Sequence, residues 1–96
     1  MHNKGVSVEW DPHKTATNFR KHGVRFSDAE GVFRDDIAIT VQDSESDMGE
    51  ERFVTLGMGQ NGQVLVVAYC YRDSSVWIIP ARPANPSERH QYEASK

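Results

Sequence analysis

The sequence is poor in cysteine and has no long apolar run, and both absences narrow the class of protein. Its 96 residues contain one cysteine, Cys70, which excludes an internal disulfide and fits a reducing compartment. No stretch approaches the roughly 20 apolar residues that a membrane helix requires. The first residues, MHNKGVSVEW, lack the apolar centre of a secretory signal. We therefore expect a cytoplasmic protein that does not enter a membrane.

Charge is low overall and is spread unevenly along the chain. The net charge of −3 argues against a general polyanion-binding protein. Residues 43–51, DSESDMGEE, hold five acids and no base, so the rest of the chain has a net charge of +2. A local basic patch is therefore compatible with the sequence.

The length fits one domain, residues 1–96, with one small core. Hydrophobic residues make up 38% and charged residues 26% of the chain, which is typical of a folded globular protein rather than a disordered one. Cys70 lies within the apolar run VLVVAYCY, so we interpret it as a buried small hydrophobic residue.

The first half of the chain carries two helix signals. Asp11 is a good N-cap, Pro12 suits the first helical position and Gly23 suits the position after the last, which predicts a helix over residues 12–22. Ala16 and Phe19 give that helix a narrow apolar stripe. The pattern SDAE, residues 27–30, has the form of a capping box and predicts a second helix that ends near residues 35–36.

The remaining segments have the alternation of strands, and a last capping box predicts a C-terminal helix. The turns fall at Asn61-Gly62 and at Asp73-Ser74, of which Asn-Gly is the stronger hairpin signal. We expect strands at residues 6–10, 37–41, 52–59, 63–72 and 75–82, a solvated acidic loop at 43–51, and a helix from Pro86. The order β-α-α-β-β-β-β-α predicts an α+β domain: a small antiparallel β-sheet with helices packed on it.

The turns also predict the register of the strands. A two-residue turn at Asn61-Gly62 pairs Gln60 with Gln63, which sets Arg52 opposite Tyr71 and Glu51 opposite Arg72. A two-residue turn at Asp73-Ser74 pairs Arg72 with Ser75 and Cys70 with Trp77. In this register Arg52 and Arg82 share one face of the sheet and Arg72 lies on the other. A slip of one residue in either turn would exchange the faces.

Several motifs in one order resemble the BrnT toxin family over nearly the whole chain. The opening VEWDPHKTATNFRKHGVRFSDAEGVFRDD is similar to the family's strand, helix and "KHGV.F..A..VF.D" segment. GEERFVTLG resembles its "GE.R....G" motif, VLVVAYCYR its next strand, and WIIPARPANPSERHQYE its C-terminal segment.

The resemblance implies a RelE-like fold and a ribonuclease toxin that cuts RNA and stops translation. It also implies a BrnA-type antitoxin, encoded beside the toxin, that binds it and represses their shared operon. We therefore expect a hetero-oligomer with the antitoxin, RNA as the substrate, and contact with operator DNA only through the antitoxin.

Metal-free cleavage of RNA needs a base for the 2′-hydroxyl, an acid for the leaving 5′-oxygen and cations for the phosphorane charge. The catalytic candidates are His22, Arg72 and Arg82, and the RNA-binding candidates are Lys21, Arg52 and Glu51. The first is a histidine, whose charge changes near neutral pH, and arginines bind phosphate through paired hydrogen bonds. No set of His, Cys and carboxylate residues has metal-ligand spacing, so we expect neither a metal nor another cofactor.

Each candidate also has a purely structural interpretation. His22 and Lys21 fit the basic end of a helix, where the helix dipole favours cations. Arg82 and Arg52 can each form a rim salt bridge with Glu50, Glu51 or Glu88, and such pairs add little stability. Glu51 opposite Arg72 would be a simple cross-strand pair. Tyr92 fits a packing anchor better than a general acid.

Some positions depart from the family pattern. Trp77 stands where the family commonly has arginine, and Pro80, Pro83 and Pro86-Ser87 replace a serine and basic residues. Trp77 can stack on a base but fits core packing beside Cys70 better, and Pro80 belongs on an edge strand or at a bulge. Two alternatives therefore stay open: a catalytically weak or inactive BrnT-like binding module, and an interaction domain outside the family.

Overall fold

The computed structural model describes residues 7–43 and 51–96, and within them the predicted order of elements is confirmed. Residue 6 of the first predicted strand and residues 44–50 of the acidic loop lie outside the described residues. No helix in the described ranges is long and apolar enough to cross a membrane. The elements are β1 (Ser7–Glu9), α1 (Pro12–His22), α2 (Phe26–Ala29), the 3₁₀ helix η1 (Glu30–Arg34), β2 (Ile39–Asp43), β3 (Arg52–Met58), β4 (Val64–Arg72), β5 (Ser75–Pro83) and α3 (Pro86–Ala94).

The sheet has five strands in the order β1-β5-β4-β3-β2 and is mixed, not purely antiparallel as predicted. Strands β2 to β5 form an antiparallel meander, but β1 runs parallel to β5 and pairs Ser7 with Ser75. The hairpin turns in the sequence fix only the direction of consecutive strands. They carry no information about β1, which reaches β5 from the other end of the chain.

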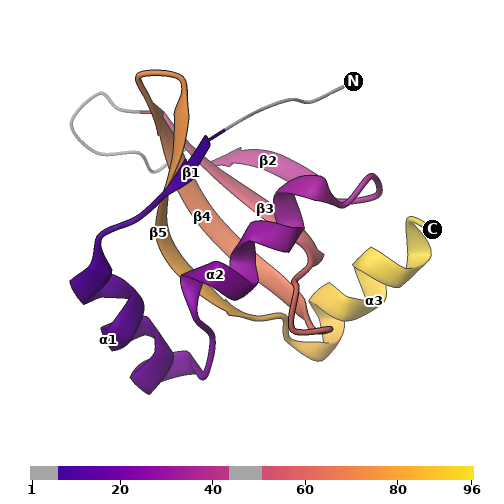
Figure 1. Cartoon of the computed structure of the whole chain (residues 1–96). Coiled ribbons are helices and arrows are strands. Elements are labelled where there is room, and N and C mark those ends of the chain that lie inside the picture. Colours follow the sequence, from indigo (N-terminus) through magenta and orange to yellow (C-terminus); the bar gives the residue numbers. More distant parts are fainter. Residues whose placement is uncertain (1–6, 44–50) are drawn as a thin grey trace.

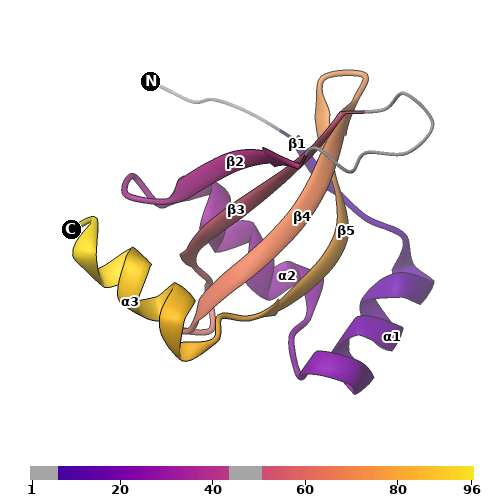
Figure 2. The same ribbon diagram turned by 180° about the vertical axis from the view of Figure 1, so that it is seen from behind.

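Helices cover the two faces of the sheet unequally (Figure 1). α2 and η1 lie on one face, over a core cluster that includes Phe26, Val32, Leu65, Val67 and Ile78. On the other face α3 covers one end, where Tyr92 packs with Leu56, Val64 and Ala84. Strand register puts Val54, Ala68 and Trp77 on this second side as well. We call it the open face, and Figure 2 shows the sheet from this side.

The β3–β4 register differs by one residue from the prediction. Gly59 donates its backbone N–H to the carbonyl of Gln63, so three residues, not two, form the loop. Of the pair Asn61-Gly62, only Gly62 has a positive φ, of 81°, as in a type I turn followed by a left-handed residue. The pairing of Arg52 with Tyr71, and of Glu51 with Arg72, is therefore wrong.

The turn at Asp73-Ser74, which had the weaker sequence signal, is confirmed. Asp73 and Ser74 both have positive φ, of 50° and 70°, in a two-residue turn that pairs Arg72 with Ser75. The predicted pairing of Cys70 with Trp77 is confirmed, and Cys70 is buried. A bulge then sets Ile79 and Pro80 together opposite Ala68, as expected for a proline that cannot donate to the ladder.

The shifted β3–β4 register and the bulge in β5 change which side chains share a face of the sheet. With Phe53 opposite Tyr69 and Val66 opposite Arg82, strand alternation puts Arg52, Arg72 and Arg82 all on the open face. The sequence pattern had placed Arg72 on the other side.

The ends of α1 follow the prediction, but its buried side does not. Asp11 accepts the backbone N–H of His13 as N-cap, and Gly23 takes the left-handed conformation with φ of 72°. Ala16 and Phe19, the expected apolar stripe, are exposed, and the residue that α1 buries is Asn18. The start of the second helix also differs from the prediction of a cap at Ser27. The helix begins at Phe26 with Arg25 as its N-cap, and the carboxylate of Asp28 accepts the N–H of Arg25.

Asn18 attaches α1 to the free edge of β5. Its Oδ1 accepts the N–H of Ala81 at 3.1 Å and its Nδ2 donates to the Ala81 carbonyl at 2.7 Å. The same Nδ2 donates to the carbonyl of Val24 at 2.8 Å. The side chain thus replaces a neighbouring strand and holds the chain where it leaves α1.

Two polar contacts hold α3. Tyr92 donates to Asp35 Oδ2 at 2.6 Å, and the same carboxylate accepts the N–H groups of Met58 and Ile37. Burial raises the pKa of Asp35, but these hydrogen bonds outweigh it and hold the pKa below its usual value. Tyr92 is therefore a packing anchor, as predicted, with its pKa raised to about 12 by burial and by Asp35. The second contact is a bidentate ion pair, in which Arg82 Nη1 and Nη2 donate to Glu88 Oε1 and Oε2 at 2.8 and 2.9 Å.

We predict that Asn18→Ala lowers the free energy of unfolding by about 3 kcal/mol, because it leaves buried backbone groups of Ala81 and Val24 without partners. Urea denaturation measures this. The matched control is Thr17→Ala on the same helix, whose exposed hydroxyl donates to the His13 carbonyl. A loss for Asn18→Ala no larger than that of the control would contradict the role of Asn18.

The hydrogen bond from Arg82 lowers the pKa of Glu88 from 4.5 to about 2. A carboxylate with a lowered folded-state pKa stabilises fully above about pH 4.5 and loses this stabilisation as the pH falls to 2. Because the Arg82 side chain is 42% exposed, we discount the shift and expect Glu88→Gln to cost on the order of 1–2 kcal/mol at neutral pH.

The difference between wild type and Glu88→Gln should therefore shrink below about pH 4.5 and be mostly lost by about pH 2, as followed by urea denaturation at several pH values. Glu93→Gln is the matched control, since Glu93 lies on the same helix in a more exposed pair with Lys96. A difference that stays constant from pH 6 to about pH 2 would refute the electrostatic explanation.

Candidate functional site

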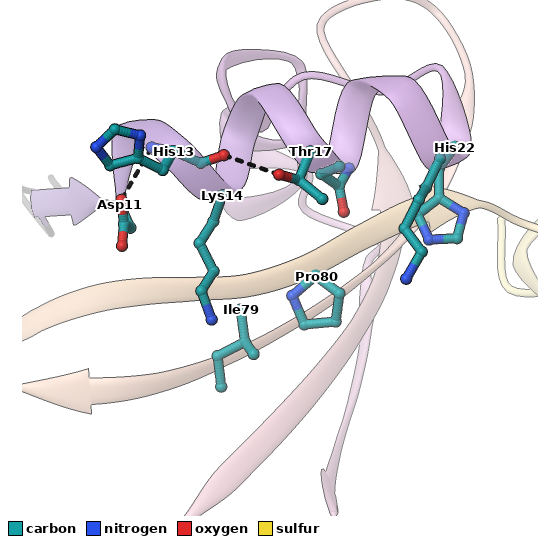
Figure 3. A pocket seen from close by; sticks show the side chains of 9 residues that line it. Asp11, His13, Lys14, Thr17, His22, Ile79 and Pro80 are labelled. Atoms are coloured by element: carbon teal, nitrogen blue, oxygen red, sulfur yellow. Dashed lines mark hydrogen bonds between the residues drawn. The ribbon is translucent and has the colours of Figure 1, made fainter.

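A groove of about 350 Å³ separates α1 from β5 on the side of the open face. Ile78 and Ala81 point into the first core, so the bulge between them turns Ile79 and Pro80 toward the strand edge and the open face. These two residues form the apolar floor of the groove. Figure 3 shows His13 and Lys14 near one end of α1 and His22 at the other.

The groove carries more positive than negative charge. Lys14, Lys21, His13 and His22 line it together with the carboxylate of Asp11, and Thr17 and Asn18 add polar groups. His13 and His22 are nine residues apart, which is about 14 Å along the helix axis. One imidazole can therefore act at each end, but the two cannot act on the same phosphodiester.

Two of the predicted site residues, Lys21 and His22, meet in this groove. Lys14 and His13 were not predicted as part of a site. The signal for Lys14 was its spacing of seven residues from Lys21, which puts both on one side of a helix. Asn18 was also missed, since its partner Ala81 is 63 residues away in the sequence.

The position of Arg82 follows from the direction of α1. Glu9, just before α1, is level with Trp77, and Asn18 is level with Ala81, so α1 runs alongside β5 in the same direction (Figure 1). The His22 end of the groove therefore lies toward Arg82. The guanidinium of Arg82 is bound to Glu88, so an RNA phosphate would compete with this carboxylate.

Arg52 and Arg72 lie at the other end of the open face. Arg72 is six residues along β4 from Val66, the partner of Arg82, which is about 20 Å. Its guanidinium lies 5.3 Å from the centre of the Trp77 ring. Arg52 forms an ion pair with Asp43 at 3.6 Å. The structure thus divides the predicted arginines between two ends of one face.

Glu51 lies beside Arg52 in the sequence but not opposite Arg72. It is exposed, and it accepts a hydrogen bond from Gln42 Nε2 at 3.0 Å. The corrected register sets it level with Tyr71, away from the cross-strand position beside Arg72 that the sequence predicted.

A second hollow, of about 270 Å³, opens on the opposite face and is lined by hydroxyl groups. Thr55 bonds to Thr40 and to Tyr69, each at 2.8 Å, and Tyr71 lies beside them. Burial, and then the neighbouring Tyr69, raise the pKa of Tyr71, so its hydroxyl stays neutral. Because none of the described residues that line this hollow is a cation, the groove beside α1 suits an anionic substrate better.

Metal binding has little support among the described side chains. Across residues 7–43 and 51–96 no three His, Cys, Asp or Glu side chains come close enough to hold an ion. What the groove can do chemically is bind phosphate through its cations and exchange a proton through His22.

Comparisons with known proteins agree with this reading of the fold. The crystal structure of the Brucella abortus ribonuclease toxin, BrnT, is similar to the chain with a TM-score of 0.65 and 24% sequence identity, over 84% of this chain and 99% of that chain. At this identity the likeness shows a shared fold. None of the curated proteins compared with the chain matches it.

The sequence pattern of one protein family matches residues 10–88, most of the chain. The family is described as "Ribonuclease toxin, BrnT, of type II toxin-antitoxin system". The chain therefore belongs to the BrnT family of ribonuclease toxins of type II toxin–antitoxin systems.

Proposed function

We propose that this chain is a single toxin domain that cleaves RNA without a metal ion and so inhibits translation. The observation that carries the proposal is the groove between α1 and β5, in which His22 and Lys21 meet above an apolar floor. The family assignment supports RNA as the substrate. A relation to RelE-like toxins is part of the same proposal.

The groove supplies the parts of the reaction as follows. His22, as the neutral imidazole, takes the proton of the 2′-hydroxyl, which attacks the adjacent phosphorus. The ammonium group of Lys21 stabilises the charge on the phosphorane and can protonate the leaving 5′-oxygen. Lys14 binds a neighbouring phosphate about 10 Å along α1, and the sugar lies against Ile79 and Pro80.

The predicted arginines then have graded roles. Arg82 lies nearest the His22 end and would assist only by exchanging Glu88 for phosphate. Arg72 and Arg52, with the nearby Glu51, would contact RNA at some distance from the cleaved bond.

A BrnA-type antitoxin is the proposed partner, in a hetero-oligomer that contacts operator DNA through the antitoxin alone. The family is one of type II systems, whose toxins act with an antitoxin. Half-buried Val54, Val66 and Trp77 on the open face leave apolar surface that such a protein can cover.

The second candidate is a binding module with weak or no nuclease activity. The pairing of Arg82 with Glu88 favours it, since this arginine is engaged in holding α3. Trp77, which replaces a cation and lies under Arg72, favours it as well.

We predict that His22→Ala lowers the rate of RNA cleavage at least about 100-fold, because it removes the proposed base. Purified protein and a defined RNA, in buffer containing a chelator, give the rate. His90→Ala is the matched control, as His90 is exposed on α3 outside the groove.

Three outcomes would separate the hypotheses. Equal rates for His22→Ala and wild type would show that the groove is not the active site. Cleavage by wild type that occurs without the chelator but is lost when the chelator is present would refute metal independence. Intact RNA with wild type, together with normal growth when soluble protein is expressed in bacteria, would favour the binding module.

A further inference from the structure

An exposed aromatic ring lies on the side of α1 away from the groove. Phe19 is 39% exposed, although its side chain is apolar and lies on a short helix of an otherwise well-packed protein. The guanidinium of Arg25 lies 3.8 Å from the centre of its ring. A hollow of about 340 Å³ beside them is lined by Thr15, Ala16, Phe19, Arg20 and Arg25.

The position of Arg25 is fixed by the segment that carries it. Val24 and Phe26 on either side are fully buried, which turns Arg25 outward. Thr15 Oγ1 accepts the N–H of Phe26 at 3.0 Å, and Asn18 holds the carbonyl of Val24. The segment Val24–Phe26 that forms this wall of the hollow is therefore held in place, since side chains of α1 bond to both of its ends.

The chemistry of the hollow matches a nucleotide. A flat ring provides a stacking surface for a base, and two arginines provide donors for the flanking phosphates. The guanidinium donors of Arg25 point outward in its plane, so it can stack on Phe19 and still bind phosphate. None of the described residues that line the hollow is acidic, and the nearby Asp28 accepts the N–H of Arg25.

We propose that Phe19, Arg20 and Arg25 form a second contact site for single-stranded RNA, in which an unpaired base stacks on Phe19. RNA would pass from the groove across the basic end of α1, Arg20 to His22, into this hollow. The site deepens and rests on the proposed function, because it would bind the same RNA on the side away from the cleaved bond. It gives a role to Arg20, the one lysine or arginine of α1 that does not line the groove.

The test measures RNA binding separately from cleavage. The probe is a labelled single-stranded 2′-O-methyl RNA of about ten nucleotides, which lacks the attacking hydroxyl, and the readout is fluorescence anisotropy. Phe19→Leu keeps the apolar bulk but removes the flat ring, and should weaken binding roughly 5- to 100-fold. Phe19→Trp should keep the wild-type affinity, a pattern that a merely structural role of the ring would not produce.

Two matched controls complete the design. Tyr71→Leu changes the other exposed aromatic ring, which is 53% exposed, and should leave the affinity within about two-fold. Arg20→Ala and Arg25→Ala should each reduce the slope of log affinity against log salt by about 0.7, whereas Arg34→Ala on η1 should not change it.

Each other result overturns the inference. Wild-type affinity in Phe19→Leu, or a loss only in Tyr71→Leu, would show that the base does not stack on Phe19. An unchanged affinity and salt slope in both arginine variants would show that Arg20 and Arg25 do not bind the RNA phosphates, which refutes the site. Cleavage of unmodified RNA by Phe19→Leu at the wild-type rate, with unchanged binding, would refute this site and leave the proposed function intact. If wild type fails to bind the probe yet cleaves RNA, the site is likewise refuted.

Discussion

The attachment of α1 to β5 through Asn18 is the interaction on which the candidate site depends. Strand β5 has β1 as a neighbour only along Ser75–Trp77, so the backbone of Ala81 would otherwise face solvent at the sheet edge. Asn18 closes this edge with one side chain, and it is the residue that α1 buries. A helix held in this way contributes almost nothing apolar to the core. Its other sides are therefore free to carry cations and an exposed aromatic ring without loss of packing.

The distribution of charge makes α1 the most favourable place for a polyanion to bind. On the open face, Arg52 is paired with Asp43 and Arg82 with Glu88, so these arginines present a reduced positive charge. The segment Pro12–His22 contains Lys14, Arg20 and Lys21 with no acid between them. A polyanion would thus meet its strongest local attraction at the helix, although the whole chain is acidic. The site and the net charge are compatible because the charges are separated in space.

Local signals in the sequence predicted the elements well, and long-range contacts were beyond them. Asp11, Pro12 and Gly23 set the ends of α1, and Asn85 with Glu88 set the start of α3, because caps act within four residues. The register predicted from Asn61-Gly62 was wrong by one residue, since the same dipeptide fits a two- or a three-residue loop. This error alone reversed the predicted faces of the β3 side chains, and the bulge at Ile79–Pro80 reversed that of Arg82. Asn18 could not be found, because nothing local marks an asparagine that will bond a strand 63 residues away.

Pro80 shows how a departure from the family pattern can be reinterpreted. In the sequence it stands where the family pattern has a serine, three residues after the cation that Trp77 replaces, and both changes argue against activity. In the structure it lies at the bulge on the strand edge, where its missing N–H needs no partner, and it forms the floor on which the groove closes. The substitution therefore shapes the groove rather than removing a charge from it. Trp77 is different, because it faces Arg72 on the open face, away from His22. The cation lost at Trp77 therefore concerns the far end of the sheet, whereas the pairing of Arg82 with Glu88 acts at the His22 end of the groove.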